Sequence, residues 1–311
     1  MQDKPNEPSF SIFTPTFNRK HTLHRAYESL LSQTYKNFDW IIIDDGSTDG
    51  TEEMVNQWIQ EAPFPIQYHW QSNQGKHIAY NHFAKYATGL LYSSIDSDDG
   101  VKPNWLERFV FHWNNFSEKE KNEFFGVTCL AENQLGELIG VPFEKDMMDG
   151  DYVEILLGGK IRGDKGGFAQ TRVFKANLFP DDVKNVYVPE SYHIHSISRN
   201  WKVRCVNERL IVPWTDDRAD HLTHALKKNV NYSGNRYANL GFSKFSMRLF
   251  PKFPKVFIAN TVQFVKLSAL LKKGLKKQWD DIGNAKGRLL WFFCLPLGYV
   301  LFLKSRITQN D

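Results

Sequence analysis

Short apolar runs alternate with amphipathic stretches over the first third of the chain. The runs "FSIFTPTF", "DWIIID", "IQYHWQ" and "LLYSSID" are rich in β-branched and aromatic residues and predict strands. The stretches between them, "TLHRAYESLLSQTY", "TEEMVNQWIQEA" and "KHIAYNHFAKYATG", carry apolar residues at helical spacing. Strands that alternate with helices in this way predict an α/β fold with a doubly wound, mostly parallel sheet.

The pattern is weaker from residue 104 to residue 214. Its segments predict a helix over 104–116, two strands within 124–143, a strand and a short helix within 164–180, a helix that begins near Pro189, and then a strand pair up to Trp214.

The C-terminal region, residues 244–311, mixes apolar residues with lysines at helical spacing. Leu289 to Leu303 is an uncharged run between Arg288 and Lys304. It is shorter than the ~20 residues of a spanning helix, and Pro296 is expected to break it. The pattern predicts an amphipathic anchor in the plane of a membrane surface, and ordinary helices packed on the body are the alternative.

Charge separates this region from the rest of the chain. Residues 244–311 hold thirteen Lys and Arg against three Asp and Glu, a net charge of +10, whereas the remainder carries −6 toward the total of +4. A basic region indicates an anionic partner. No motif that reads a nucleic-acid groove is present, so an anionic membrane surface is favoured and nucleic acid is not. The polar start of the chain, without a signal-peptide pattern, predicts a cytoplasmic protein, and three scattered cysteines predict free thiols.

Three carboxylates follow the fourth predicted strand within four residues: Asp96, Asp98 and Asp99. Crowded carboxylates repel one another, but a divalent cation makes the crowding favourable. Mg²⁺ and Mn²⁺ take hard oxygen ligands, and Mg²⁺ is usually shared between one or two carboxylates and substrate phosphates. The alternative is an acidic turn that caps a helix beginning near Pro103.

The same edge of the sheet collects two more polar segments. Ligands of open α/β sheets bind beyond the carboxyl ends of the strands, which places Thr14, Asp45 and Asp98 on one edge. Asp45 lies in "DDGSTD", whose residue types are also those of an ordinary surface turn. The segment "TPTFNRK" after the first strand contains no glycine, which disfavours a dinucleotide-binding fold.

Four motifs together resemble family 2 glycosyltransferases with the GT-A fold: "FTPTFNR", "SLLSQTYKNFDWIIIDDGSTDGT", "NQGKHIAYNHF" and "IDSDDGVKPNWL". The resemblance is close over residues 8–110 and extends more loosely to about residue 225. It implies an inverting, metal-dependent transfer of a sugar from a nucleotide diphosphate donor, expected to be a UDP-sugar, to a hydroxyl group of a saccharide. The GT-A fold would be followed by the basic, amphipathic helical extension.

The resemblance also implies roles for single residues. Those matching the donor site are Thr14, Pro15 and Asn18 of the uridine pocket, Asp45 that reads the base, Lys76 that faces the nucleotide, and Asp96. Asp98 and Asp99 match the metal ligands, with Mn²⁺ or Mg²⁺ as the cofactor and Asp98 as the first choice. Which of Asp96 and Asp99 shares the metal stays open, and Lys76 is alternatively a solvated surface lysine.

Glu190 matches the family's catalytic base, which removes the proton of the acceptor hydroxyl. Without the resemblance, a Glu at the start of a helix is explained by the helix dipole. Many relatives carry a second carboxylate here, whereas this chain has Ser191. His77 is a candidate for donor contact, and Trp214 with Asp216 and Asp217 could close over the site. Two histidine pairs are expected to be core or surface residues, and metal binding is the alternative: His193 with His195, and His221 with His224.

The expected organisation has three parts. Residues 1–110 would bind the nucleotide sugar, residues 111–243 the acceptor, and residues 244–311 the membrane. The acceptor is expected to be lipid-linked, in the assembly of a cell-surface polysaccharide such as capsule or O-antigen, with the protein peripheral on the inner face of the cell membrane. The alternatives are a nucleotidyltransferase, or a catalytically inactive module that binds a nucleotide sugar.

Overall fold

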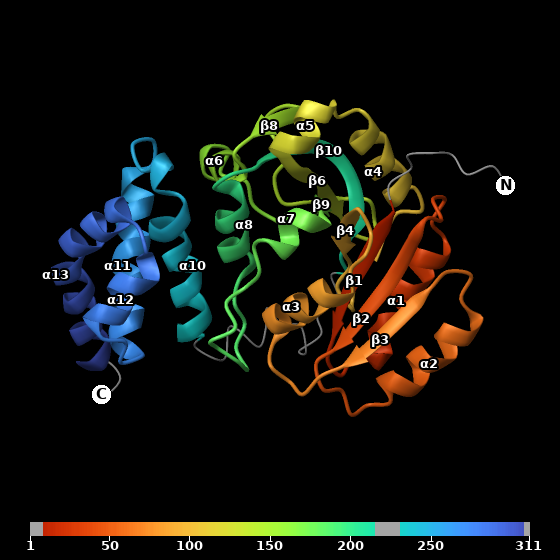
Figure 1. Ribbon diagram of the computed structural model, residues 1–311, viewed down its shortest axis with the longest axis horizontal. Coiled ribbons are helices and arrows are strands. Elements are labelled where there is room, and N and C mark those ends of the chain that lie inside the picture. Colours follow the sequence, from red (N-terminus) through yellow and green to blue (C-terminus); the bar gives the residue numbers. More distant parts are fainter. Residues whose placement is uncertain (1–8, 215–230, 308–311) are drawn as a thin grey trace. The chain divides into compact units, whose positions relative to one another are not determined.

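The computed structural model describes residues 9–214 and 231–307 of the 311 residues. This part of the chain forms two compact units. The first unit comprises residues 9–178 and 200–214, and the second comprises residues 179–199 and 231–307 (Figure 1). Four residues with predicted roles lie outside the described part of the chain: His221, His224, Asp216 and Asp217.

The first unit is built on one twisted sheet with the strand order β3-β2-β1-β4-β9-β6-β10-β5. The pairs among β3, β2, β1 and β4 are parallel, as is β6 with β10, and the remaining pairs are antiparallel. The strands are β1 (Phe10–Thr16), β2 (Phe38–Asp44), β3 (Ile66–Trp70), β4 (Leu91–Ser94), β5 (Gly100–Val101), β6 (Phe124–Glu132), β7 (Leu138–Ile139), β8 (Met147–Gly150), β9 (Lys165–Gln170) and β10 (Lys202–Val212).

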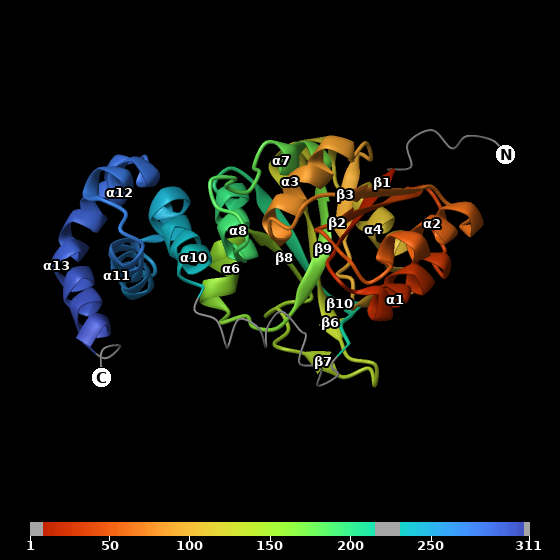
Figure 2. The ribbon, with the colours of Figure 1, turned by 90° about the horizontal axis from the view of Figure 1, so that it is seen from below.

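Helices cover both faces of this sheet (Figure 2). They are α1 (Lys20–Leu31), α2 (Thr51–Glu61), α3 (Lys76–Tyr86), α4 (Trp105–Asn114), α5 (Glu118–Glu123), α6 (Tyr152–Gly158) and α7 (Thr171–Lys175). Strand side chains alternate between faces. Phe10 and Ile12 therefore join the core with α1, α2 and α4, while Phe13 lies 4.5 Å from Tyr80 and 4.7 Å from Phe83 of α3, ring centre to ring centre, on the opposite face.

Two strand predictions in the second half of the sheet are wrong. The expected strand pair after Trp201 is the single strand β10, whose pairing with β6 shifts register between Cys205 and Arg209. The polar residues Asn207 and Glu208 read as a turn, but they lie within the strand, where the Phe143 backbone N–H donates to Asn207 and the Arg108 side chain to Glu208. The run 135–143 contributes only Leu138–Ile139 as strand, and the pattern gave no sign of α5, α6, β5 or β8.

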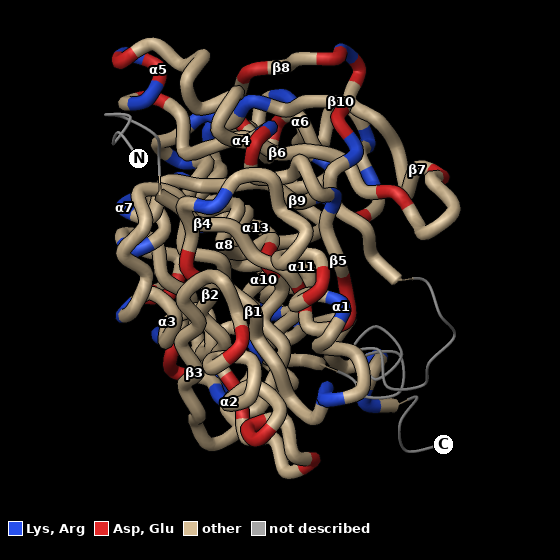
Figure 3. Tube along the Cα trace, turned by 90° about the vertical axis from the view of Figure 1, so that its right-hand side faces the viewer, with Lys and Arg blue, Asp and Glu red and all other residues tan. Residues whose placement is uncertain are grey.

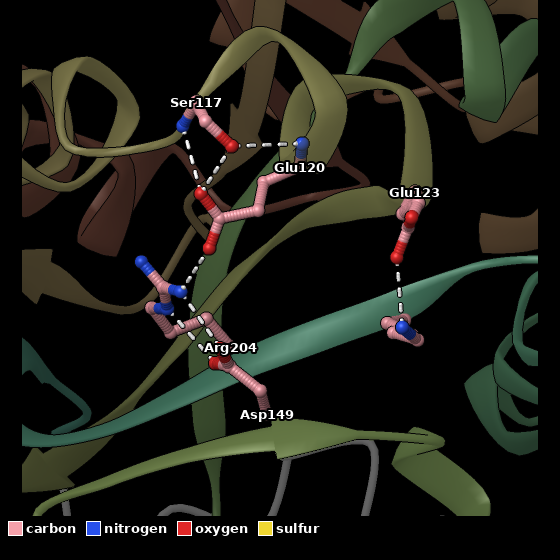
Figure 4. Close-up of polar contacts among 6 residues, drawn as sticks. Ser117, Glu120, Glu123, Asp149 and Arg204 are labelled. Atoms are coloured by element: carbon pink, nitrogen blue, oxygen red, sulfur yellow. Dashed lines mark hydrogen bonds and ion pairs between the residues drawn. The ribbon is translucent and has the colours of Figure 1, made fainter.

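Charged residues of both signs are interspersed over the first unit (Figure 3). The most buried of its arginines in an ion pair, Arg204 of β10, joins three elements (Figure 4). Its guanidinium donates to Asp149 of β8 at 2.7 Å and 2.8 Å and to Glu120 of α5 at 2.8 Å. Glu120 also closes the capping box of α5 with Ser117. These contacts fix α5 and β8, two short elements that the hydrophobic pattern did not predict.

The second unit is helical among its described residues. It contains α8 (Glu190–Ser198), α10 (Tyr232–Phe245), the short 3₁₀ helix η1 (Met247–Leu249), α11 (Pro254–Leu270), α12 (Leu275–Ile282) and α13 (Ala285–Ile307). Helix α10 packs against α8 and α11, and α11 packs against α13 (Figures 1 and 2).

The expected break at Pro296 is wrong, because α13 runs through it without interruption. An internal proline costs a helix about 3 kcal/mol through a lost hydrogen bond and a steric clash. Packing offsets that cost: Trp291 and Cys294 before the proline and Gly298 after it are all buried in the unit. The tertiary contacts on both sides of Pro296 keep the chain helical at a position where local preference would end the helix.

Candidate active site

Three neighbouring parallel strands end at one edge of the first unit's sheet. In the order β2-β1-β4, they lead into the residues after Asp44, Thr16 and Ser94. Thr14, Asp45 and the acidic turn of residues 96–99 therefore lie at the carboxyl ends of adjacent strands, as the sequence predicted. This is the edge at which open α/β sheets bind ligands.

Asp45 fixes the loop that connects β3 to α3. Its buried carboxylate accepts hydrogen bonds from the Gln71 side chain at 2.7 Å and from the backbone N–H groups of Gln74 at 2.8 Å and Gly75 at 2.7 Å. Gly75 has φ +100°, a backbone conformation that other residues rarely adopt. The carboxylate and the glycine together determine where α3 begins, and so where its first residue, Lys76, lies.

Lys76 extends from this loop to the acidic turn. Its ammonium group lies 2.8 Å from Oδ1 and 2.9 Å from Oδ2 of Asp96. Both side chains are partly exposed, at 19% for Lys76 and 42% for Asp96, so the pair is accessible from solvent. The Lys76 side chain is thus held at the acidic turn by a salt bridge with Asp96.

The far end of the acidic turn is tied to Trp214 and Arg25. The Trp214 backbone N–H donates to Asp99 Oδ1 at 3.2 Å, and Arg25 of α1 donates to the backbone carbonyl of Asp98 at 3.1 Å. The Arg25 guanidinium also lies 4.1 Å from the centre of the Trp214 ring, which stays 39% exposed. Trp214 therefore lies at the acidic turn.

The electrostatics of the turn are unfavourable for three free carboxylates. Burial, and then repulsion from Asp96 and Asp98, raises the pKa of Asp99 to about 8. A divalent cation suits this donor set, because all candidate ligands are hard carboxylate oxygens beside an open edge. Among the described residues no group of three His, Cys, Asp or Glu converges on one point. Proteins usually bind Mg²⁺ through one or two carboxylates, and substrate phosphates complete the coordination. The carboxylates of the acidic turn fit a site of this kind.

The predicted residues of the first strand make structural contacts. Thr14 is fully buried, and its hydroxyl oxygen accepts from Trp40 Nε1 at 2.9 Å, while Pro15 is buried within β1. Asn18, with φ +52°, donates its N–H to Ser47 Oγ and accepts from the Thr48 N–H, both at 2.8 Å. Asn18 therefore joins the ends of β1 and β2, and its role toward a nucleotide stays a prediction.

Three contributors to this edge were missed by the sequence reading. Asp44 is fully buried and accepts from the Tyr68 hydroxyl at 2.6 Å and the Ser47 N–H at 2.7 Å, so it shapes the turn that presents Asp45. Gln71 lies in a polar loop, where the sequence pattern does not distinguish it from its neighbours. Arg25 lies on the buried side of α1, and a charged residue on a buried helix face is the signal that would have marked it.

Glu190 is the first residue of α8, in the second unit, and its side chain is exposed. The next histidines along α8 are structural. His193 stacks on Phe179 at 4.8 Å between ring centres, and His195 bonds Ser246 Oγ through Nδ1 at 2.6 Å. Burial, followed by the charge of Arg248, lowers the pKa of His195 to about 3. His77 is buried in α3.

Comparison with known proteins finds a family that matches part of the chain and solved structures that share its fold. Residues 11–117 match the family described as glycosyl transferase family 2. The minor teichoic acid biosynthesis protein GgaB of Bacillus subtilis is 32% identical over 142 residues, 44% of this chain and 15% of that protein. The chain spans less than half of the length of the first curated relatives that it matches.

Two solved structures share the fold at low sequence identity. A crystal structure of S. aureus TarS with UDP-GlcNAc has a TM-score of 0.62 at 15% identity and covers 91% of this chain and 90% of that one. A mannosyltransferase from Pyrobaculum calidifontis, with GDP-Man and Mn²⁺, has a TM-score of 0.53 at 16% identity and covers 96% and 88%. The α/β fold class expected from the sequence is confirmed, as is a helical C-terminal region.

Proposed function

We propose, from the match of residues 11–117 to glycosyl transferase family 2, that this protein transfers a sugar from a nucleotide diphosphate donor, a UDP-sugar, to a hydroxyl of a saccharide. The observation that carries the proposal is the connection at the sheet edge. Asp45 fixes the loop of Gln74 and Gly75, and that loop places Lys76 on Asp96, the first residue of the acidic turn. A nucleotide and its diphosphate need these features side by side.

In this proposal the donor lies along the carboxyl edge from β2 to β4. Thr14, Pro15, Asn18 and Asp45 would form the base and ribose end. Lys76 and Asp96 would meet the diphosphate and the sugar, with the Lys76 ammonium group turning from Asp96 toward the phosphate oxygens. A point charge that is already held at the edge loses little entropy on binding, which favours this role over that of a solvated surface lysine.

Asp98 and Asp99 would hold Mn²⁺ or Mg²⁺ together with the diphosphate oxygens. The bound cation would neutralise the charge that develops on the leaving nucleoside diphosphate. Support comes from the three crowded carboxylates and from the structural neighbour that contains GDP-Man and Mn²⁺. Arg25 and the Trp214 backbone would keep the turn in the shape that presents these carboxylates.

Glu190 would act as the general base. The acceptor oxygen attacks the anomeric carbon of the donor sugar, its proton passes to the Glu190 carboxylate, and the bond from that carbon to the diphosphate oxygen breaks with its electron pair on the diphosphate. One displacement inverts the anomeric centre. Support for this step is the resemblance of the sequence around Glu190 and the exposure of its carboxylate at the start of α8.

The acceptor is proposed to be a lipid-linked saccharide in cell-surface polysaccharide synthesis, at the inner face of the cell membrane. The similarity to a minor teichoic acid biosynthesis protein and the basic C-terminal region support this placement. We propose the same three parts as above: residues 1–110 for the donor, residues 111–243 for the acceptor and residues 244–311 for the membrane. No nucleic-acid partner is included.

A panel of UDP-sugars tests the function, with release of UDP measured in the presence of Mn²⁺, with and without EDTA. We expect release from one donor that EDTA abolishes and that Asp98→Asn lowers by about a hundredfold or more. Calorimetric binding of UDP without turnover of any donor would instead identify an inactive binding module. Release of pyrophosphate from UTP and a sugar phosphate would identify a nucleotidyltransferase.

A further inference from the structure

Helix α13 of the second unit carries an uninterrupted apolar face toward solvent. Every exposed residue from position 289 to position 303 is apolar: Leu289, Phe292, Phe293, Pro296, Leu297, Val300 and Leu303. We call these seven residues the outer stripe. Phe293 is 71% exposed and Phe292 and Leu289 are each 61% exposed. A helix facing water places polar side chains on its outer face, and this one has none over four turns.

The opposite face of α13 is packed on its own unit. Gly287, Trp291, Cys294 and Gly298 are buried, and a Cβ added at Gly298 would lie 2.5 Å from the Val265 side chain of α11. At about 100° per residue, these four positions project on the side of the helix away from the outer stripe. The helix is therefore held by one face, and the outer stripe is its free face.

Cations and aromatic side chains border the outer stripe. Lys286 and Arg288 precede it, and Lys304 and Arg306 follow it. The Arg288 guanidinium lies 4.5 Å from the ring centre of Trp279 on α12, a ring that is 43% exposed. Apolar residues that meet hydrocarbon, with Trp and basic residues at the level of the headgroups, are the composition of helices that lie in a membrane interface.

We propose that α13 lies in the plane of an anionic lipid bilayer, with its outer stripe among the acyl chains and its flanking cations on anionic headgroups. Length and composition alone would also let this 23-residue helix cross a membrane. Crossing would surround α13 with lipid and separate Trp291 from α12, where Trp291 Nε1 donates to Gln278 at 3.0 Å. An in-plane helix keeps that bond and the packing on α11.

Charge complementarity selects the bilayer over a second copy of the chain as the occupant. Residues 244–311 carry +10, so two copies that met through this region would bring like charges together, whereas anionic lipid would be attracted. The inference does not require catalysis, because binding is measured without any donor.

Flotation of the full chain with vesicles tests the proposal. We expect the protein to float with vesicles of phosphatidylcholine and phosphatidylglycerol, to bind phosphatidylcholine vesicles far more weakly, and to be released by alkaline carbonate. Phe293→Glu should lower binding at least about tenfold, since a charge would enter the acyl region. The matched control is Leu135→Glu, which changes an 83% exposed leucine of the first unit and should leave binding unchanged. Circular dichroism of both variants confirms that they are folded.

Three results would overturn the proposal. Binding that survives Phe293→Glu would remove the outer stripe from the contact. Retention after alkaline carbonate would mean that the helix crosses the bilayer. A dimer in size-exclusion chromatography that Phe293→Glu dissociates, together with no flotation, would make a second copy the occupant. Failure of sugar transfer with a soluble acceptor would affect only the proposed activity.

Discussion

Asp45 shows how a single carboxylate can act through a loop. Its three N–H donors all come from the segment between β3 and α3, so its first effect is on the position of Lys76. Asp49, five residues after Asp44, provides a comparison with Asp45. It accepts hydrogen bonds from the Lys20 and Thr51 N–H groups and from the Thr51 hydroxyl, with no connection to Lys76.

We predict that Asp45→Ala weakens binding of UDP at least about tenfold and lowers the free energy of unfolding by about 2 kcal/mol, because buried N–H groups lose their acceptor. Asp49→Ala should also destabilise the protein but leave UDP binding near its original value. Calorimetry with UDP and Mn²⁺, together with denaturant unfolding, measures both quantities. Equal loss of UDP binding in the two variants would show that general destabilisation, and not the loop, is responsible.

Glu190 makes a second prediction at the scale of the residue. Glu190→Gln should lower kcat by a factor of about 10²–10⁴, because the amide cannot take the acceptor proton, while UDP binding is retained. Glu52→Gln changes a glutamate in the first turn of α2 and is the control for loss of a helix-dipole contact. A Glu190→Gln enzyme with the original kcat would place the base elsewhere.

At the scale of elements, β10 organises the half of the sheet that the pattern predicted poorly. It pairs with β6, β8 and β5, and its side chains reach α4 and α5. Arg204 packs its guanidinium over Phe116, 4.5 Å from the ring centre, in addition to its two carboxylate partners. Lys202, two residues before it, forms an exposed ion pair with Glu123.

Arg204→Ala should lower the free energy of unfolding by about 2 kcal/mol, a value reduced for the partial exposure of both carboxylates. The substitution removes the side chain that links α5 and β8 to β10, and it leaves Glu120 and Asp149 without the Arg204 cation. Lys202→Ala, which removes a solvent-screened pair on the same strand, should cause no measurable change. Denaturant unfolding of the two variants tests the contrast, and similar losses in both would mean that the burial of Arg204 is unimportant.

For the whole molecule, four histidines that the fold buries wholly or in part make stability sensitive to acid, while the raised pKa of Asp99 acts in the opposite direction. Burial lowers the pKa of His69, His82 and His112 in the first unit and of His195 in the second. The unfolded chain takes up these protons at a pKa of about 6.5, whereas the folded state resists them. The contribution of these histidines to stability is therefore complete above that value and is lost as the pH falls toward the folded pKa, which is about 3 for His195.

We predict that the melting temperature falls as the pH is lowered from about 6.5 to about 5. His195→Gln should reduce the slope of the free energy of unfolding against pH by up to about 1.4 kcal/mol per pH unit. The exposed His24 gives the control variant His24→Gln, which should leave the slope unchanged. Thermal unfolding followed by circular dichroism at several pH values measures it. A His195→Gln protein with the original slope would exclude His195 as a source of the acid sensitivity.

Much of the first unit followed from the hydrophobic pattern, because strands and helices of this length bury whole faces. The four parallel strands, the three helices between them and the edge that carries Thr14, Asp45 and Asp98 were all predicted. The short elements α5, α6, β5 and β8 were not, since a few residues do not establish a period. The single strand β10 was not predicted either, because the polar side chains in its middle bond to groups that are distant in sequence.

The sequence by itself determined the fold class, the order of the first elements, the acidic turn and the basic character of the C-terminal region, because these depend on local period and composition. Only the tertiary structure decided that Asp45 positions Lys76, that Arg25 and Trp214 hold the acidic turn, and that α13 continues through Pro296 with one apolar face free. Each of these depends on contacts between segments far apart along the chain, and distance in sequence is what a local pattern cannot encode.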